Sequence, residues 1–329
     1  MRVGKVPYNL LQRLVFSRLG AVNDDVVGPG IGLDAAVIKL GDRSVVVAAD
    51  PITGSVRDIG MLAVHVNAND VAMMGGIPRW FLSVILLPPD TSPDVLDQIT
   101  QQIDATARGI GIAVVGGHTE VSPQISSPIV VGMAMGEATW TKERRSGPRD
   151  DIVLTKEAGI EGTAILATER EEVVVRGLGE DVVERAKRLR KKISVVPDAA
   201  IASRYATAMH DPTEGGIAGG LHEMAFASGV GFRVWKDRIP LLEETKRICA
   251  LFRVDPLRLM GSGALLFTVD PQHTDQVMHD LEGGGIRATV IGRCTRTPEK
   301  EIRIKGRYRR LPWPRRDDLW VALERSIEP

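Results

Sequence analysis

The apolar and polar positions of the first 140 residues follow two periods. Short β-branched runs such as RSVVVAA and FLSVILL have the composition of buried strands. Between them lie longer segments with apolar residues three and four positions apart, which is the spacing of an amphipathic helix. We expect strands over 43–49, 81–87, 112–115 and 129–135, and helices over 58–75 and 92–108. This alternation predicts an α/β domain that ends near residue 136.

A polar segment with Gly and Pro, TKERRSGPRDD over 141–151, follows and is interpreted as a domain boundary. Strand patterns resume over 152–155, 231–235, 263–269 and 288–291, and helix patterns over 180–192, 198–208, 216–228, 241–251 and 275–281. The first of these helices carries interleaved charges of both signs, typical of a solvated face. The segment 296–316 is basic, and we interpret it either as an exposed tail or as a contact to a partner or a phosphate.

The length of 329 residues exceeds what one hydrophobic core usually supports, so we expect two domains, 1–140 and 150–329. Lys plus Arg equals Asp plus Glu, and the five Trp form no series with basic residues, so nothing favours nucleic-acid binding. No run approaches the ~20 apolar residues of a membrane span, and the N-terminus does not resemble a signal peptide. Two distant cysteines, Cys249 and Cys294, fit a reducing cytoplasm.

Acidic residues next to glycines occur in five segments of the first two-thirds of the chain. These segments are GPGIGLDAAVI (28–38), AADPIT (48–53), NANDVAMMGGIPRW (67–80), GGHTEVSP (116–123) and HDPTEGG (210–216). Mg²⁺ usually takes one or two carboxylates together with substrate phosphates, and Asp34, Asp50 and Asp70 could supply them. Each is alternatively a helix cap or a turn residue, although Asp70 lies within an otherwise apolar helix and needs a partner.

The glycines of these segments could bring backbone amides close to phosphate. Gly28–Gly32 is not a dinucleotide-binding signature, since no strand precedes it, and a plain loop is the alternative. His118 could contact phosphate or metal, transfer a proton, or simply satisfy a hydrogen bond. In HDPTEGG two glycines precede a helix, which is an anion site in many proteins, while Thr213 or Glu214 could instead cap that helix. Covalent catalysis has no support, because no nucleophile motif is present.

Taken in order, LDAAVI, AADPIT, VNANDVAMMGGIPRW, GGHTEVSP and HDPTEGGI resemble the aminoimidazole ribonucleotide (AIR) synthase superfamily over nearly the whole chain. The superfamily includes the PurM purine enzyme, hydrogenase maturation factor HypE, selenophosphate synthetase and thiamine-monophosphate kinase. The sequence is most similar to the HypE-like, AIR synthase-related branch. The resemblance implies a two-domain PurM-like fold of the α/β (α+β) class. In it, the N-terminal domain pairs with that of a second subunit into a dimeric β-barrel core beside a C-terminal α/β domain.

The resemblance also implies a composite Mg–ATP site. The metal ligands it implies are Asp34, Asp50 and Asp70. Nucleotide contacts are expected from Lys5, Gly30, Gly32, Asn69, Gly116, Gly117, Thr119, Gly215 and Gly216. Catalytic residues are expected to be His118, Glu120 and Asp211.

The shared chemistry of the superfamily is the phosphorylation of an amide- or carbamoyl-type oxygen by ATP, followed by loss of the phosphate. We expect a homodimer that acts on a small-molecule or protein-bound acceptor, with a metallocentre maturation protein as a further partner. The sequence departs from its relatives at Leu33, where this branch often has an acidic residue. It also has no cysteine after Cys294, whereas HypE carries its carbamoyl group on a terminal cysteine. Two alternatives follow: a nucleotide-binding scaffold without turnover, and a kinase resembling thiamine-monophosphate kinase.

Overall fold

The computed structural model describes residues 3–21, 24–53, 55–138 and 145–326. Its contacts divide the chain into two compact units. The N-terminal unit comprises Asp24–Gly28 and Asp34–Lys142, and the C-terminal unit comprises Met1–Asn23, Pro29–Leu33 and Glu143–Pro329. The boundary expected over 141–151 begins in residues outside the described ranges, so the domain limits 1–140 and 150–329 stay a prediction.

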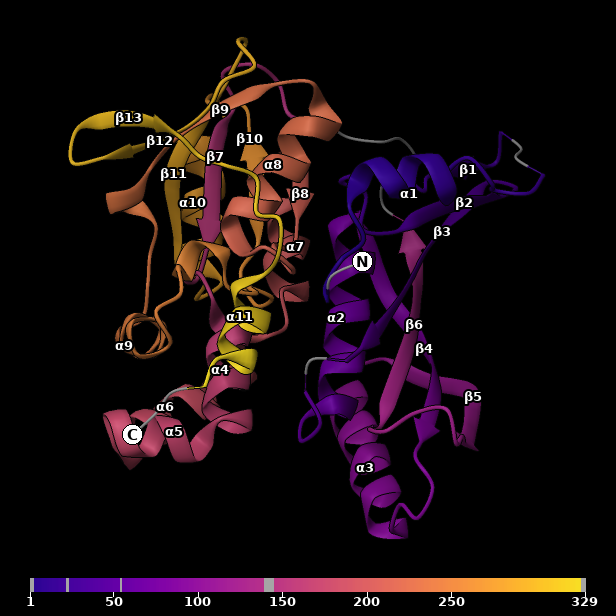
Figure 1. The fold of residues 1–329 in the computed structure, drawn as a ribbon. Helices are drawn as coiled ribbons and strands as arrows, with labels where there is room; N and C mark the ends of the chain where they lie inside the picture. Colours follow the sequence, from indigo (N-terminus) through magenta and orange to yellow (C-terminus); the bar gives the residue numbers. More distant parts are fainter. Residues whose placement is uncertain (1–2, 22–23, 54, 139–144, 327–329) are drawn as a thin grey trace. The chain divides into compact units, whose positions relative to one another are not determined.

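An open, mostly antiparallel sheet forms the N-terminal unit (Figure 1). Its described strands are β1 (Val26–Val27), β2 (Ala36–Leu40), β3 (Arg43–Ile52), β4 (Gly76–Leu87), β5 (Ala113–Val121) and β6 (Ile129–Ala138), in the order β1-β2-β3-β6-β4-β5. The helices described in this unit are α2 (Ile59–Met73) and α3 (Pro93–Gly109). Among its described strands, only β4 and β5 run parallel, and α3 connects them, as a parallel pair requires. Ser92 caps α3 by accepting from the Asp94 amide, as the sequence predicted.

One face of this sheet is covered by α2 and α3, and the other is open to solvent. In β3 the buried residues Val46, Ala48 and Ile52 alternate with more exposed ones, which is the pattern of a strand with one buried face. Apolar side chains on β4, β5 and β6 nevertheless remain exposed. They are Ile77, Trp80, Val84, Val114, Val115, Val121 and Met133.

Two strands of this unit are longer than predicted. The sequence suggested that a strand ends at Asp50, but β3 continues through Pro51 to Ile52. Beyond Val47 it pairs with β6 alone, and a proline is tolerated where a strand has one free edge. The segment from Gly116 to Glu120, expected as a turn after a strand, is part of β5 and pairs with β4 throughout.

The C-terminal unit contains a second mixed sheet with helices around it (Figure 1). Its described strands are β7 (Asp151–Thr155), β8 (Ala206–His210), β9 (Gly231–Trp235), β10 (Leu266–Val269), β11 (Ala288–Thr295), β12 (Lys300–Ile304) and β13 (Arg307–Arg310), in the order β13-β12-β9-β11-β7-β10-β8. The helices are α1 (Tyr8–Leu14), α4 (Ile160–Glu169), α5 (Glu171–Leu178), α6 (Glu180–Arg188), α7 (Val196–Ala202), α8 (Gly216–Ser228), α9 (Glu243–Phe252), α10 (Thr274–Gly283) and α11 (Asp318–Glu324).

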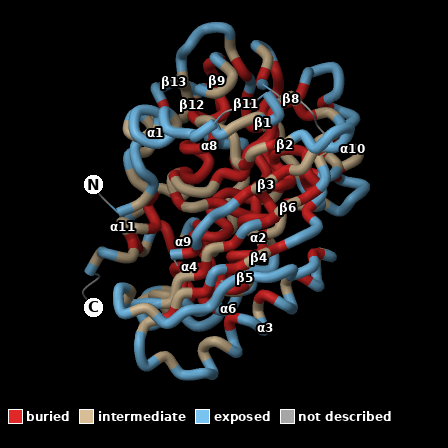
Figure 2. Tube along the Cα trace, turned by 90° about the vertical axis from the view of Figure 1, so that its right-hand side faces the viewer, coloured by how far each residue is buried: buried red, intermediate tan, exposed pale blue. Residues whose placement is uncertain are grey.

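Two of the apolar clusters in this unit involve helices near the site, and the buried residues appear in red in Figure 2. The first cluster packs α8 onto the sheet and includes Leu221 of α8 together with Phe232 and Leu266 of the strands. The second joins helices α4, α5, α6, α9 and α11 around residues such as Phe252. These two cores hold α8 and the turn that precedes it in a fixed place.

The sequence prediction was wrong in three places of the C-terminal unit. The helix expected over 198–208 ends at Ala202, and its last residues lie in β8, because Ala206–His210 pairs with β10. Helices α1, α4, α5 and α11 were not predicted at all. The basic segment over 296–316 is not an exposed tail, since it forms the hairpin β12–β13 at the edge of the sheet.

The two-domain α/β architecture confirms the predicted fold class, although each sheet is open rather than a closed barrel within one chain. No helix in the described part of the chain is both long enough and apolar enough to cross a membrane.

Candidate functional site

A buried asparagine fixes the backbone of β3 where Asp50 lies. The Asn67 side chain on α2 accepts from the Asp50 amide at 2.7 Å and donates to the Asp50 carbonyl at 3.2 Å. It also donates to the Ala63 carbonyl at 2.8 Å within its own helix. A buried amide with three good partners is a stiff connector. The exposed carboxylate of Asp50 therefore extends from a strand that is anchored to α2.

The other two predicted metal ligands lie in the same unit. Asp34 precedes β2 by two residues, and the first residue of β2, Ala36, pairs with Val47 on β3. This register puts Asp34 at the end of the β2–β3 ladder that is nearer Asp50. Asp70 is one helical turn beyond Asn67 on α2 and is only 5% exposed.

Asn69, a predicted nucleotide contact, is fully buried on the same helix. No group of three or more His, Cys, Asp or Glu residues within the described ranges could hold a metal ion. The described residues therefore do not form a preformed metal site made of protein ligands alone. This fits Mg²⁺ that arrives with nucleotide phosphates, because such Mg²⁺ needs only one or two protein carboxylates.

Strand β5 carries His118 and Glu120 away from Asp50. Asp50 pairs with Gly132 on β6, Gly132 pairs with Ser83 on β4, and Ser83 pairs with Gly117 on β5. Three spacings of ~4.8 Å put Gly117 about 14 Å from Asp50. His118 follows Gly117, so its side chain points to the opposite, open face of the sheet. Within one chain, the structure does not bring His118 together with Asp50.

The open face holds both predicted catalytic residues of β5. His118 Nε2 and Glu120 Oε2 are 3.4 Å apart, and both side chains are more than half exposed. Thr119, between them, points to the other face and is also exposed. Gly117 is required here for packing, because a Cβ at this position would be 2.0 Å from the Ser83 carbonyl oxygen. Gly116 has no such contact.

The glycine loop ahead of Asp34 packs on the C-terminal unit, of which 29–33 is a part. Gly32 has a φ of +78°, and a Cβ there would be 2.8 Å from the Glu223 carbonyl oxygen on α8. Only glycine combines that conformation with such a close approach. At Gly30 a Cβ would meet the Leu33 side chain at 3.2 Å. These glycines therefore have a packing role, and their predicted nucleotide contact stays a prediction.

The HDPTEGG turn of the C-terminal unit already binds an internal carboxyl group. Gly215 donates its amide to the Asp317 carboxylate at 2.5 Å, and the Gly216 amide donates to the Thr213 carbonyl at 3.0 Å. Asp317 also accepts from the amides of Met260 and Leu319. Burial raises the pKa of Asp317 to about 7, although these three hydrogen bonds act to lower it. The side chain of Asp317 thus uses the amide that the sequence assigned to a phosphate.

Four side chains meet on α8 beside this turn. Glu223 accepts from Tyr8 Oη and from Lys5 Nζ, the latter at 3.4 Å. Its second oxygen is 2.8 Å from His210 Nε2, at the end of β8. Glu223 and His210 are about 95% buried or more, and burial raises the pKa of Glu223. Lys5, a predicted nucleotide contact, therefore pairs with a carboxylate. Asp211, a predicted catalytic residue, follows His210 in the chain and is only 1% exposed.

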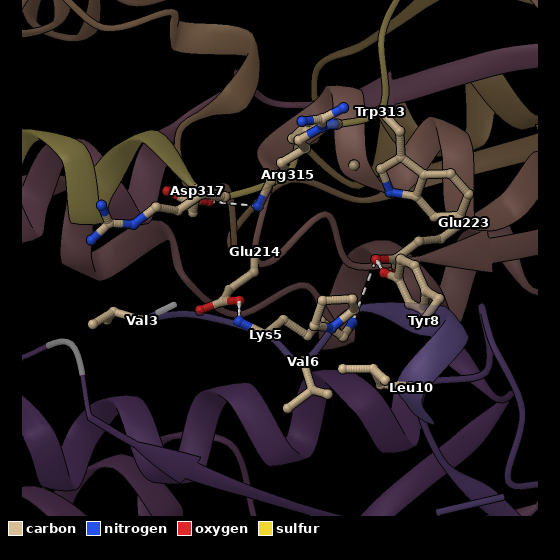
Figure 3. A pocket seen from close by; sticks show the side chains of 15 residues that line it. Val3, Lys5, Val6, Tyr8, Leu10, Glu214, Glu223, Trp313, Arg315 and Asp317 are labelled. Atoms are coloured by element: carbon tan, nitrogen blue, oxygen red, sulfur yellow. Dashed lines mark hydrogen bonds and ion pairs between the residues drawn. The ribbon is translucent and has the colours of Figure 1, made fainter. Parts of the chain in front are cut away.

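Lys5, Tyr8 and Glu223 border a cavity of about 650 Å³ within the C-terminal unit (Figure 3). Its lining consists of the N-terminal segment, the start of α8 and the segment before α11. The residues are Val3, Lys5, Val6, Pro7, Tyr8, Leu10, Glu214, Gly215, Gly219, Glu223, Trp313, Pro314, Arg315, Arg316 and Asp317. Glu214 accepts from the Lys5 amide at 2.5 Å and from Trp320 Nε1 at 3.0 Å. The cavity has the size of a small-molecule site with an apolar wall and a few polar groups.

Two family models match most of the chain. The N-terminal domain of the AIR synthase related proteins matches residues 32–138, and their C-terminal domain matches residues 147–305. The chain belongs to the AIR synthase related family. Within the PurM-like superfamily it falls in the HypE-like branch, as the sequence motifs indicated.

The relatives of this AIR synthase related chain include proteins named for hydrogenase formation and a thiamine-monophosphate kinase. A putative hydrogenase expression/formation protein of Methanocaldococcus jannaschii is 29% identical, and the alignment covers 89% of each chain. Carbamoyl dehydratase HypE of Rhizobium leguminosarum bv. viciae is 30% identical, with 71% of this chain and 67% of that protein aligned. Thiamine-monophosphate kinase of Pyrococcus horikoshii is 26% identical, with 86% and 88% aligned.

Solved structures confirm the family fold. A HypE–HypF complex matches with a TM-score of 0.76 at 20% identity and covers 93% of this chain and 99% of that one. HypE in complex with ATP matches with a TM-score of 0.68 at 21% identity and covers 96% of this chain and 97% of that one. AaThiL complexed with AMPPCP and TMP matches with a TM-score of 0.72 at 19% identity and covers 93% of this chain and 97% of that one.

Sequence reasoning missed several residues of the cavity in this AIR synthase related chain. Glu223 carried a readable signal, because it is a carboxylate within the apolar helix segment GIAGGLHEMA and so needs partners. Tyr8 and Trp313 gave no such signal. They are 305 residues apart, and only the fold brings their rings to a centroid distance of 4.8 Å.

Proposed function

We propose that this chain is a homodimeric, Mg–ATP-dependent enzyme that activates an amide- or carbamoyl-type oxygen by phosphorylation. Family membership supports an ATP-using chemistry, since a HypE relative is named carbamoyl dehydratase and a HypE structure contains ATP. The observation in this chain that carries the proposal is the Asn67 anchor on Asp50, with Asp70 one turn away. Such an anchor is expected for a carboxylate that must hold its position as phosphates bind.

In this proposal Asp34, Asp50 and Asp70 hold Mg²⁺ together with the nucleotide phosphates. When bound, the metal neutralises charge on the phosphoryl group. The remaining work is done by the chain itself. Asn67 ties the β3 backbone at Asp50 to α2. The orientation of the Asp50 carboxylate is therefore set before the nucleotide binds.

The open face of the N-terminal sheet supports the homodimer. Val84 and Met133 are 37% and 39% exposed on adjacent strands, and β5 is exposed along its whole length at the edge of the sheet. A second copy would cover this apolar surface and would place its own residues beside His118 and Glu120. We propose that these two residues, with Asp211, complete catalysis in such a dimer.

The chain's two cysteines are free and buried, and burial raises the pKa of each thiol to about 12. They suit the cytoplasmic location that we propose. A maturation protein is the partner we propose besides the second copy, because one matching structure is a HypE–HypF complex. The acceptor is then either a small molecule or a group carried on that partner.

A kinase is the second candidate function. The thiamine-monophosphate kinase relative spans nearly the whole chain, and the AaThiL structure contains an ATP analogue. A scaffold that binds nucleotide without turnover is the third, motivated by Leu33 in place of an acidic residue. The three candidates differ in the fate of the γ-phosphate.

Phosphorus NMR of Mg–ATP incubated with the protein separates the candidates. We expect slow release of free phosphate by the wild type, and loss of that release in Asp70→Ala at unchanged circular dichroism. Transfer of the phosphate to added thiamine monophosphate would assign the kinase. Intact ATP after prolonged incubation of the wild type would contradict turnover and favour the scaffold.

A further inference from the structure

The cavity in the C-terminal unit offers carboxylate acceptors at its polar end. Glu214, in the turn before α8, and Glu223, within α8, line it. Asp317 also lines it, but three backbone amides already occupy its oxygens. Within the described part of the chain, N–H and O–H donors surround both carboxylates. Glu214 accepts from the Lys5 amide and Trp320 Nε1, and Glu223 contacts Tyr8 Oη, Lys5 Nζ and His210 Nε2.

One of these donors is partly exposed. The Lys5 ammonium is 3.4 Å from Oε1 of the buried Glu223 and 5.6 Å from the centroid of the Tyr8 ring, and its side chain is 46% exposed. A contact of 3.4 Å is at the long end of the range for a hydrogen bond. Tyr8 and His210 would remain on Glu223 if the ammonium left. Lys5 therefore occupies a position that a ligand could take over without dismantling the cluster (Figure 3).

The rest of the cavity is apolar and aromatic. Tyr8 and Trp313 face each other at 4.8 Å between ring centroids, and Val6 and Leu10 line the wall below them. Trp313 also stacks on His222 at 5.1 Å, which orients the indole ring. Such a wall suits a flat apolar group.

We propose that this cavity binds the acceptor through a planar N–H-bearing group, a primary carboxamide or an amidine, placed against Glu223 and Glu214 with its apolar remainder against Trp313. The inference rests on the proposed function, because a carboxamide supplies both the N–H donors for these carboxylates and an oxygen for activation. In the free protein Lys5 takes the place of that group.

An anion site is the competing interpretation of the same cavity. Arg315 lines it, is exposed, and forms no ion pair with any residue in the described ranges. Arg316 is already paired with Glu324. If Arg315 set the specificity, the cavity would select a carboxylate or phosphate instead of an N–H donor.

Benzamidine, benzamide and benzoate are matched probes, since they share a phenyl ring and differ in the polar group. We expect calorimetric titration without nucleotide to show benzamidine and benzamide binding, and benzoate not binding. Lys5→Met should tighten benzamidine binding about threefold, because the competing ammonium is gone. Lys191→Met, at an exposed lysine on the same unit, should leave it unchanged.

Glu223→Gln should abolish benzamidine binding, whereas Glu282→Gln, at an exposed position, should not. Lys5→Met keeps the test decisive if the buried Glu223 variant does not fold, since Lys5 lies on an exposed segment. Unchanged benzamidine affinity in Lys5→Met, or benzoate binding that Arg315→Gln removes, overturns the proposal. Failure of these titrations while Mg–ATP still binds refutes this inference alone. Amide binding without any Mg–ATP binding refutes the proposed function instead.

Discussion

Replacing Asn67 by alanine should destabilise the N-terminal unit by about 3 kcal/mol. The side chain is fully buried and forms three hydrogen bonds, two of them to the Asp50 backbone and one to the Ala63 carbonyl. A hydrogen bond in a protein contributes about 1 kcal/mol net, and the loss is larger where a buried partner stays unpaired. Asn67→Asp should cost more, about 4 kcal/mol. Its carboxylate would face the carbonyl oxygens of Asp50 and Ala63, to which the amide now donates.

Urea unfolding followed by circular dichroism measures both free energies. Asn9→Ala is the matched control, because Asn9 is exposed on α1, and we expect it to stay within about 0.5 kcal/mol of the wild type. The order wild type, Asn67→Ala, Asn67→Asp is the diagnostic result. If Asn67→Ala unfolds at the wild-type urea concentration, or if aspartate is tolerated better than alanine, Asn67 does not anchor β3 as we describe.

Three further predictions concern pH, strand pairing and assembly. Burial raises the pKa of Glu161 from 4.5 to about 7, so its contribution to stability is complete below pH 4.5 and falls by about 3 kcal/mol as the pH rises to 7. Glu161→Gln should remove that loss, and urea unfolding of both proteins at pH 5 and pH 8 tests it; an equal pH dependence of the two would refute it. Gly117→Ala should separate β5 from β4, because the added Cβ would be 2.0 Å from the Ser83 carbonyl oxygen. Faster hydrogen exchange confined to β5 is the expected result, and unchanged protection would contradict it. Val84→Asp with Met133→Asp should convert a dimer into a monomer in analytical ultracentrifugation, whereas a monomeric wild type would contradict the assembly.

The sequence predicted those elements whose own residues determine them. Helix α3 and strand β9 follow from apolar periodicity, whereas α2 is apolar and buried on nearly every side. The cap at Ser92 follows from local hydrogen bonding. Asp50 lies inside a strand because of its pairing with β6, which no local pattern encodes. Likewise, Ala206–His210 has the alanine content of a helix but is held in the sheet by β10. Where pairing between distant segments decides the conformation, local propensity cannot predict it.

The residues of the candidate site also differ in whether the local sequence can predict them. Asp70 was predicted from a carboxylate in an apolar helix, and Glu223 carries the same signal on α8. The separation of His118 from Asp50 could not be predicted, because it depends on strand order and on the alternation of side chains across four strands. The meeting of Lys5 with Glu223 depends on the path of the N-terminal segment, 218 residues away along the chain.

Calorimetric titration of Mg–ATP into the wild type, Asp50→Asn and Asp104→Asn tests the central claim most directly. Asp104 is an exposed aspartate on α3 of the same unit and serves as the matched control. We expect the wild type and Asp104→Asn to bind Mg–ATP equally, and Asp50→Asn to bind at least tenfold more weakly, since a lost charged contact costs about 1.5–3 kcal/mol. No binding by the wild type, or the same affinity in Asp50→Asn, would contradict a Mg–ATP site built on this strand.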